Sequence, residues 1–477
     1  MAFSSVQFLF VFLPLALAVY WICPKRLRNI VLGAFSLLFF AWAGLKGAAV
    51  LVLLACINWL GGLWLGWLAH KKPLLAVLVL LDMAVLGGFK YAGFAAESIN
   101  AVVPGLLPVL SPALPLGISF YVFTAIGYCV DVAVGRAEPE KSPFKFAVFL
   151  AFFGHGPSGP IVRYNQQAPQ LDPRSEARKV DLDRFSYGIK RLILGLAKKA
   201  IIADQLALIY AKVASVPAAT LPAPILILGY TAYMMQLYFD FSGYSDMAIG
   251  IGEFFGITLP ENFDYPYLAC SIGEYWRRWH MSLSGWFRDY VYIPLGGSRC
   301  RLRRTCLNLL IVFTLTGLWH GAAWQYVMFG LLHGLILCAE RLGLRRALER
   351  LPPVLRPPVH RHGAVADAGH LRCAGPERRP GCAVGHLYLA ERGQGLHAGR
   401  LCGCQAAADS GGVLPAVRAA AGAAPQAERS PLRPQSAVPG RGSGAAGAAV
   451  LWPDAGHGGH VQRIHLFPIL KEGADHA

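Results

Sequence analysis

Apolar runs of about twenty residues recur along most of the chain, and they limit its folds more than any other feature, because a helix of about this length crosses the hydrocarbon core of a bilayer. The chain is 55% hydrophobic and 15% charged, which is typical of a membrane protein. We therefore predict an all-α polytopic membrane protein with about ten membrane segments. The predicted apolar helical runs cover residues 6–23, 30–45, 47–69, 74–91, 115–133, 144–162, 188–215, 222–239, 305–319 and 322–342.

The basic residues stand in short clusters between the apolar runs, as is typical of cytoplasmic loops. Clusters at residues 25–28 and 70–72 alternate with the loop around Lys46, which predicts that the N-terminus lies outside the cytoplasm. Membrane topology thus explains the formal net charge of +17 without a nucleic acid partner. The first run has no preceding basic residue and no following cleavage site, so we expect a retained anchor and not a signal peptide.

Glycine and proline interrupt several runs, notably at residues 115–117 and 156–160. Such breaks are tolerated at membrane depth only where protein or a cavity supplies partners for the backbone. Residues 240–304 mix aromatic, acidic and basic side chains, and within them residues 275–292 have the Trp and Arg content of a membrane interface. We expect broken, re-entrant or interfacial helices there, and not a plain ring of straight spans.

The last part of the chain, residues 351–477, is rich in Ala, Gly, Arg and Pro, and we treat residues 1–350 as the membrane domain. Nothing in this tail is apolar enough to span a membrane. Nine of the fourteen histidines lie there, but their irregular spacing does not indicate metal ligands. Residues 465–471, shifted by one nucleotide, can encode Ile-Tyr-Phe-Gln-Phe and a stop, which suggests a lost reading frame. The alternative is a disordered extension.

His320 stands at the end of the run 305–319, in the motif Gly317-Leu318-Trp319-His320-Gly321. Ionisable groups in membrane segments are costly and therefore point to function. If a helix begins near Arg304, it places His320 about 24 Å from the cytoplasmic edge. A neutral imidazole there can act as a general base toward a hydroxyl. A buried histidine bonded to a backbone carbonyl explains the position equally well.

Arg277, Arg278 and His280 form a second candidate group, in Glu274-Tyr275-Trp276-Arg277-Arg278-Trp279-His280. The two guanidinium groups can hold the phosphates of a donor such as coenzyme A through charge-assisted hydrogen bonds. The residues alone favour a simpler interpretation, which is an interfacial helix anchored by Trp and Arg.

Asp240 and Asp246 enclose three hydroxyl-bearing residues directly after an apolar run. They can coordinate water, orient a histidine or cap a helix, and capping is the default for Asp and Ser before a new helix. His155 and His333 are more simply structural. The sequence has no phosphate-binding Gly-rich loop, no Gly-x-Ser-x-Gly elbow and, in its apolar part, no metal-ligand spacing. The chemistry therefore rests on scattered histidines and carboxylates, and no metal is predicted.

Together with further motifs, these residues resemble the membrane-bound O-acyltransferase family, most closely its alginate O-acetylase branch. The resemblance covers residues 1–350. The motifs that carry it are Phe3-Ser4-Ser5, Phe8-Leu9-Phe10, Phe89-Lys90-Tyr91 and residues 115–121, 159–164, 236–250, 276–284 and 317–321.

The resemblance implies a ring or funnel of tilted and broken helices in the bacterial inner membrane, surrounded by membrane lipid. It implies that an acetyl thioester such as acetyl-CoA enters from the cytoplasm as substrate, with no bound cofactor. The residues expected at the site are the signature histidine His320, the second histidine His280, the supporting residues Asp240, Asp246 and Trp319, and the donor-binding residues Arg277 and Arg278.

The expected reaction is acetyl transfer across the membrane for O-acetylation of alginate, finished on the polymer by periplasmic or membrane acetyltransferase partners. O-acetylation of peptidoglycan or cellulose is the alternative within the family, because those relatives share the motifs. A protein of another class, a transporter or channel, would use the broken helices and buried His and Asp without chemistry. A nucleic-acid-binding role is disfavoured because the Arg residues of the tail are diluted among Ala, Gly and Pro without interleaved aromatics.

Overall fold

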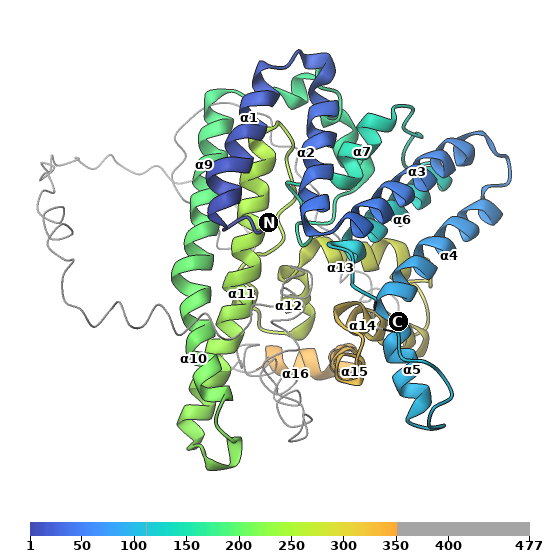
Figure 1. The fold of residues 1–477 in the computed structure, drawn as a ribbon. Coiled ribbons are helices and arrows are strands. Elements are labelled where there is room, and N and C mark those ends of the chain that lie inside the picture. Colours follow the sequence, from blue (N-terminus) through green and yellow to red (C-terminus); the bar gives the residue numbers. More distant parts are fainter. Residues whose placement is uncertain (111, 351–477) are drawn as a thin grey trace, which may run out of the picture. The chain divides into compact units, whose positions relative to one another are not determined.

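The computed structural model describes residues 1–110 and 112–350, and within these ranges every regular element is a helix (Figure 1). The all-α prediction is therefore confirmed for this part of the chain, whereas the tail, residues 351–477, lies outside the described residues. The α-helices are α1 (Leu13–Ile22), α2 (Arg28–Ala43), α3 (Leu45–Trp67), α4 (Lys71–Lys90), α5 (Ala92–Asn100), α6 (Ile118–Ala133), α7 (Pro143–Ala151), α8 (Tyr164–Gln167), α9 (Leu182–Ala197), α10 (Asp204–Ala214), α11 (Ala223–Phe254), α12 (Ile272–Arg278), α13 (Met281–Phe287), α14 (Leu302–His320), α15 (Trp324–Ala339) and α16 (Arg345–Glu349). The π-helical stretches are η1 (Phe8–Phe12), η5 (Lys198–Ala203), η8 (Arg288–Tyr292) and η9 (Glu340–Leu344), and the 3₁₀ turns are η2 (Lys25–Leu27), η3 (Ala168–Gln170), η4 (Glu176–Arg178), η6 (Ala218–Thr220) and η7 (Pro266–Leu268).

The described residues contain helices suited to a bilayer. Four are long and apolar enough to cross a membrane, namely Lys25–Ala43, Leu45–Trp67, Lys71–Lys90 and Trp324–Ala347. Two shorter apolar helices, Phe8–Ile22 and Ile118–Ala133, coincide with further predicted segments. This pattern supports a multi-pass membrane protein.

The predicted run 144–162 is helical only in its first half, because α7 ends at Ala151 before a stretch rich in glycine and proline. Most of residues 152–162 are nevertheless buried. The ring of Phe153 packs among Phe8, Phe12 and Phe39, and its backbone N–H donates to the Ser36 hydroxyl at 3.1 Å. The irregular backbone is thereby enclosed by protein, as membrane depth requires.

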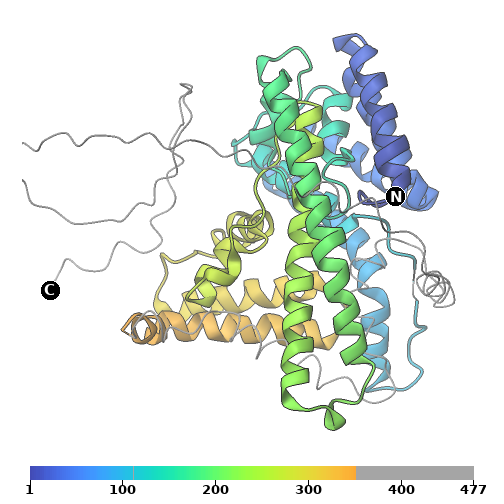
Figure 2. The same ribbon diagram turned by 90° about the vertical axis from the view of Figure 1, so that its left-hand side faces the viewer.

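The longest described helix, α11, packs closely against α9 because glycines face one another across their interface (Figures 1 and 2). A methyl group on Gly195 would collide with the carbonyl oxygen of Gly243. One on Gly188 would lie 2.9 Å from the carbonyl oxygen of Gly250. The order of these pairs makes the helices antiparallel, and small residues at membrane helix interfaces permit such close backbone approach.

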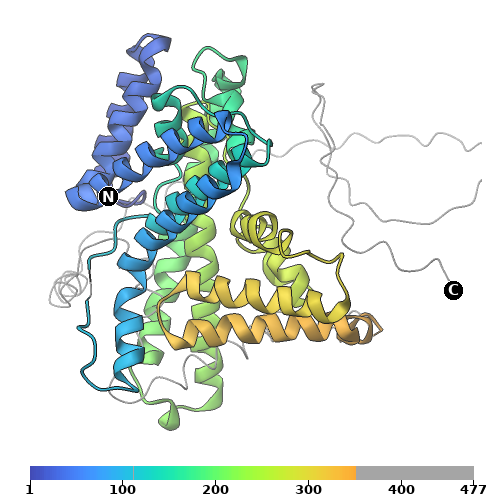
Figure 3. The ribbon, with the colours of Figure 1, turned by 90° about the vertical axis from the view of Figure 1, so that its right-hand side faces the viewer.

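Helices α14 and α15 form a second close pair, which runs crosswise to α10 and α11 (Figures 2 and 3). A methyl group on Gly317 would collide with the carbonyl oxygen of Tyr326 and lie 3.0 Å from the Cα of Gly330. The predicted helix leading to His320 is thus confirmed. The expected depth of His320, about 24 Å from the cytoplasmic edge, stays a prediction.

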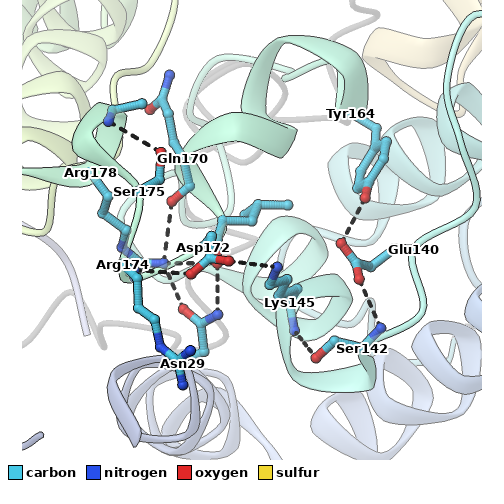
Figure 4. Close-up of polar contacts among 12 residues, drawn as sticks. Asn29, Glu140, Ser142, Lys145, Tyr164, Gln170, Asp172, Arg174, Ser175 and Arg178 are labelled. Carbon is cyan, nitrogen blue, oxygen red and sulfur yellow. Dashed lines mark hydrogen bonds and ion pairs between the residues drawn. The ribbon is translucent and has the colours of Figure 1, made fainter. Parts of the chain in front are cut away.

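A buried arginine fastens the loop before α9 to other parts of the bundle. Arg178 donates from Nη1 to the Oδ1 of Asn29 at 2.6 Å (Figure 4). Its Nε donates to the Tyr20 hydroxyl at 3.2 Å and the Phe255 carbonyl oxygen at 3.3 Å. Because guanidinium offers five donors in a rigid fork, this one residue joins α1, α2 and the end of α11.

Replacing Gly195 with Ala should force α9 and α11 apart and lower the free energy of unfolding by about 1–3 kcal/mol, the usual cost of overpacking. The matched control is Gly33→Ala in α2, where a methyl group would meet nothing within 4 Å. Thermal unfolding of both variants in the same detergent provides the measurement. Equal stability of the two variants would contradict the close packing of α9 on α11.

Candidate active site

His320 is the last residue of α14, and the chain leaves the helix through Gly321. A methyl group on Gly321 would collide with the ring of Tyr326, so the tight turn into α15 requires glycine. The partly exposed His320 ring lies against Trp319, with ring centroids 5.1 Å apart, and against Phe329, at 6.0 Å. Its imidazole makes no hydrogen bond to another described residue, so both ring nitrogens remain available to a substrate.

His280 is completely buried at the start of α13, and its backbone has a φ of 45°. This left-handed conformation is uncommon for a residue other than glycine, and such outliers cluster at functional sites. The ring of His280 lies among Phe120 of α6 and Phe241 of α11, with centroids 6.3 and 4.7 Å away. It also contacts Trp319 of α14, at 5.7 Å. Three helices distant in sequence therefore hold this one imidazole.

Asn262 determines which nitrogen of His280 carries the proton. The Oδ1 of Asn262 lies 3.1 Å from the Nδ1 of His280 and accepts hydrogen bonds from the backbone N–H and hydroxyl of Ser282 at 3.2 and 2.9 Å. Because this oxygen only accepts, we assign the proton to Nδ1. The buried Nε2 then carries a lone pair, and it has no hydrogen-bond partner among the described residues.

Trp319 brings the two histidines to one place, because its ring contacts both of theirs. The indole is buried, and its Nε1 donates to no described residue. Buried polar atoms are usually hydrogen-bonded, so the unpaired Nε1 of Trp319 and Nε2 of His280 mark the surroundings of Trp319 as a place for a polar ligand. The structure thus brings the predicted site residues His280, Trp319 and His320 together.

The two predicted supporting carboxylates lie inside α11, so the expectation that they cap a helix is wrong. Asp240 pairs with Lys199 at 2.9 Å. Asp246 pairs with Lys198 at 2.6 Å and with Arg191. No hydrogen bond joins either carboxylate to a histidine among the described residues. Their observed contacts hold α9 and η5 against α11, and Phe241, next to Asp240, contacts His280.

The two adjacent arginines have different surroundings. Arg278 pairs with Glu274 at 2.9 Å and Asp264 at 3.3 Å, within its own segment of the chain. Arg277 makes no ion pair to another described residue and instead lines a cavity of about 200 Å³, together with Arg288. Successive side chains of the helix α12 point in different directions around its axis, which separates two residues that the sequence treats alike.

The cavity follows the face of α14 that ends at His320. Its wall on that helix consists of Leu309, Val312, Phe313 and Thr316, which recur at helical spacing. The next positions on this face are Trp319 and His320. The rest of the lining is Gly273, Trp276, Leu283, Ser284, Phe287, Tyr292 and Leu337. The cavity is therefore largely apolar, with two guanidinium groups, and lies along the helix of the catalytic candidate.

Two further histidines of the membrane domain, His155 and His333, are buried as well. The Nδ1 of His333 lies 2.9 Å from the carbonyl oxygen of Phe329, one turn earlier in α15. His155 is buried beside Phe152, in the irregular stretch after α7. Among the described residues, no three His, Cys, Asp or Glu side chains gather as metal ligands.

Asn262 and Arg288 were not found from the sequence. Asn262 lies in the polar stretch 240–304, but an uncharged amide does not stand out among its charged neighbours. Arg288 was included only in the predicted interfacial segment, 275–292. The sequence signal for both residues was only the mixture of residue types around them. Their places at the site become clear only from their contacts in the folded structure.

Comparison with known proteins places these residues in a family context. The family model of membrane-bound O-acyltransferases matches residues 119–350. The chain is 42% identical over 365 residues to a probable alginate O-acetylase of Azotobacter vinelandii, which covers 75% of this chain and 71% of that protein. It is 40% identical over 363 residues to a probable alginate O-acetylase of Pseudomonas aeruginosa, with coverages of 74% and 69%.

A peptidoglycan O-acetyltransferase of Helicobacter pylori is 34% identical over 371 residues, with coverages of 71% and 70%. The range matched by the family model contains all the candidate residues from Asp240 to His320. The all-helical fold and these comparisons agree, and the chain belongs to the membrane-bound O-acyltransferase family as an acyltransferase of the membrane.

Proposed function

We propose that this O-acetyltransferase passes acetyl groups from a cytoplasmic thioester donor across the bacterial inner membrane for O-acetylation of alginate. The observation that carries the proposal is that the rings of His280 and His320 both contact the ring of Trp319. Trp319 lies at the end of the face of α14 that lines the cavity. The names of the relatives from Azotobacter vinelandii and Pseudomonas aeruginosa support alginate as the polymer.

The chemistry follows from a neutral imidazole beside a thioester. His320 removes the proton from the acceptor hydroxyl while the oxygen of that hydroxyl attacks the acetyl carbonyl carbon of the thioester. The carbon–sulfur bond breaks as the new ester bond forms, and the proton on His320 passes to the departing thiolate. The Nε1–H of Trp319 is the nearby donor suited to the developing oxyanion, and the Nε2 of His280 is the acceptor suited to hold a hydroxyl or protonated group.

The donor half of the site is the cavity between α12, α13, α14 and α15. Its apolar wall suits the pantetheine-like arm of a thioester, and Arg277 with Arg288 suits the phosphates. Asp240 and Asp246 support the site indirectly, by holding α9 and η5 on the helix that carries Phe241.

Peptidoglycan is the second candidate acceptor, favoured by the relative from Helicobacter pylori. Separate acetyltransferase partners in the periplasm or membrane would finish the transfer onto the polymer. Acetyl content of alginate and of peptidoglycan, measured in a deletion strain complemented with this chain, separates the candidates. Transport without chemistry predicts that neither polymer gains acetyl groups and that thioester is not consumed.

Replacing His320 with Ala should reduce acetyl transfer by about 10²- to 10⁴-fold, the usual contribution of a general base. Thiol release from the acetyl thioester by the purified, folded protein measures the loss. The control is His70→Ala, an exposed histidine before α4, which should leave the rate unchanged. Retained activity in a folded His320→Ala protein would refute the assignment.

Replacing Arg277 with Gln should raise the KM for acetyl-CoA about 10-fold or more, because a charge-assisted hydrogen bond contributes about 1.5–3 kcal/mol. The matched variant is Arg278→Gln, whose ion pairs lie outside the cavity and whose loss should leave KM nearly unchanged. Acetyl-pantetheine, which lacks phosphates, should bind both variants alike. Equal effects of the two substitutions on the KM for acetyl-CoA would contradict this donor site.

A further inference from the structure

The end of α4 meets the end of α14 (Figure 3), and two side chains there bind the backbone next to His320. The hydroxyl of Tyr91 donates to the carbonyl oxygen of Leu318 at 2.8 Å. The ammonium of Lys90 donates to the carbonyl oxygen of Trp319 and lies 3.1 Å from the hydroxyl oxygen of Ser119 in α6. The two contacts with α14 join positions more than 220 residues apart in the chain.

The accepting carbonyls are those that a helix leaves without partners. The last four carbonyl groups of an α-helix have no intrahelical donor, and their summed dipole favours a positive charge at that end. In α14 this end is occupied by the residues of the active-site motif. Lys90 and Tyr91 therefore supply from another helix both the hydrogen bonds and the charge that complete the C-terminus of α14.

The same lysine also holds the indole ring that the two histidines share. The Nζ of Lys90 lies 5.4 Å from the centroid of the Trp319 ring, within cation–π range. Phe120, in the turn of α6 that contains Ser119, packs its ring against Trp319 at 5.3 Å. Any rotation of the last turn of α14 would break these contacts and move His320 relative to His280.

We propose that Lys90 and Tyr91 are positioning residues, which fix the last turn of α14 so that His320 faces the reacting groups. This inference rests on the proposed function, with His320 as the base. Neither residue lines the cavity of Arg277 and Arg288, so they do not bind the phosphates of the donor. Their action runs through the backbone of Leu318 and Trp319, and it sets the rate of the chemical step and not the affinity for the donor.

The test compares four variants of the full chain in thioester-dependent acetyl transfer. Lys90→Met keeps the aliphatic stem and loses the donors, whereas Lys90→Arg keeps charge and donors. Tyr91→Phe removes a single oxygen atom. Lys46→Met, at an exposed lysine that begins α3, is the matched control.

Lys90→Met should lower kcat by about 10- to 100-fold, since a misplacement of about 1 Å can cost 10²-fold, while the donor KM changes less than about twofold. Tyr91→Phe should lower kcat by a smaller factor, about 3- to 10-fold, as the loss of one neutral hydrogen bond predicts. Lys90→Arg should recover most of the rate, and Lys46→Met should match the unaltered protein. A raised KM with unchanged kcat would overturn the proposal.

A second arm asks whether Lys90 acts through His320. In a His320→Ala background the Lys90→Met substitution should cost no further activity, because residues that act as a unit are non-additive. An inactive His320→Ala protein together with a fully active Lys90→Met protein would overturn this inference alone. An unaltered protein that consumes no thioester, or an active His320→Ala protein, would instead overturn the proposed function. If Lys90→Met does not fold, Tyr91→Phe decides the outcome, and an unchanged kcat there refutes the proposal.

Discussion

Inside a bilayer every backbone amide and carbonyl has to find its partner within the protein, and the rest of this structure depends on that constraint. Helices satisfy it locally, and the buried irregular stretch 152–162 satisfies it in part through hydrogen bonds such as those from Phe153 N–H to the Ser36 hydroxyl and from Gly159 N–H to the His155 carbonyl. Where a helix ends, its last carbonyl groups need partners from elsewhere in the protein. The carbonyls of Leu318 and Trp319 near the end of α14 accept from Lys90, the last residue of α4, and from Tyr91, which follows it, so the requirement for backbone partners connects the end of α14 to a distant helix.

Charged side chains inside the protein also need partners. A carboxylate removed from water needs a partner, and Asp240 and Asp246 find theirs in basic residues of α9 and η5. Those ion pairs lie beside the glycine contacts that let α9 approach α11. Arg277 is different, because it lines a largely apolar cavity and makes no ion pair within the described part of the chain. That difference between paired and unpaired charge distinguishes Arg277 from the residues whose ion pairs hold α9 and η5 on α11.

Several features of the site were predictable from residue patterns, and others were not. The family motifs pointed to both His280 and His320, and the structure places the rings of both against Trp319. The roles expected for Asp240 and Asp246 as caps were wrong, because α11 continues through them for a total of 32 residues. Local propensity cannot foresee this, since the small residues that normally favour a turn are here used for close helix packing.

The sequence by itself determined the class of the molecule, because hydrophobic length and charge placement act locally along the chain. It also drew attention to His320, because a histidine in an apolar run is costly wherever that run folds, while the catalytic roles expected of His320 and His280 came from the family resemblance. Only the tertiary structure decided which of Arg277 and Arg278 faces the cavity and which ring nitrogen of His280 carries the proton. It also decided which residues bind the carbonyls at the end of α14. Those outcomes depend on side chains from helices far apart in sequence, such as Asn262 and Lys90, whose proximity no local pattern records.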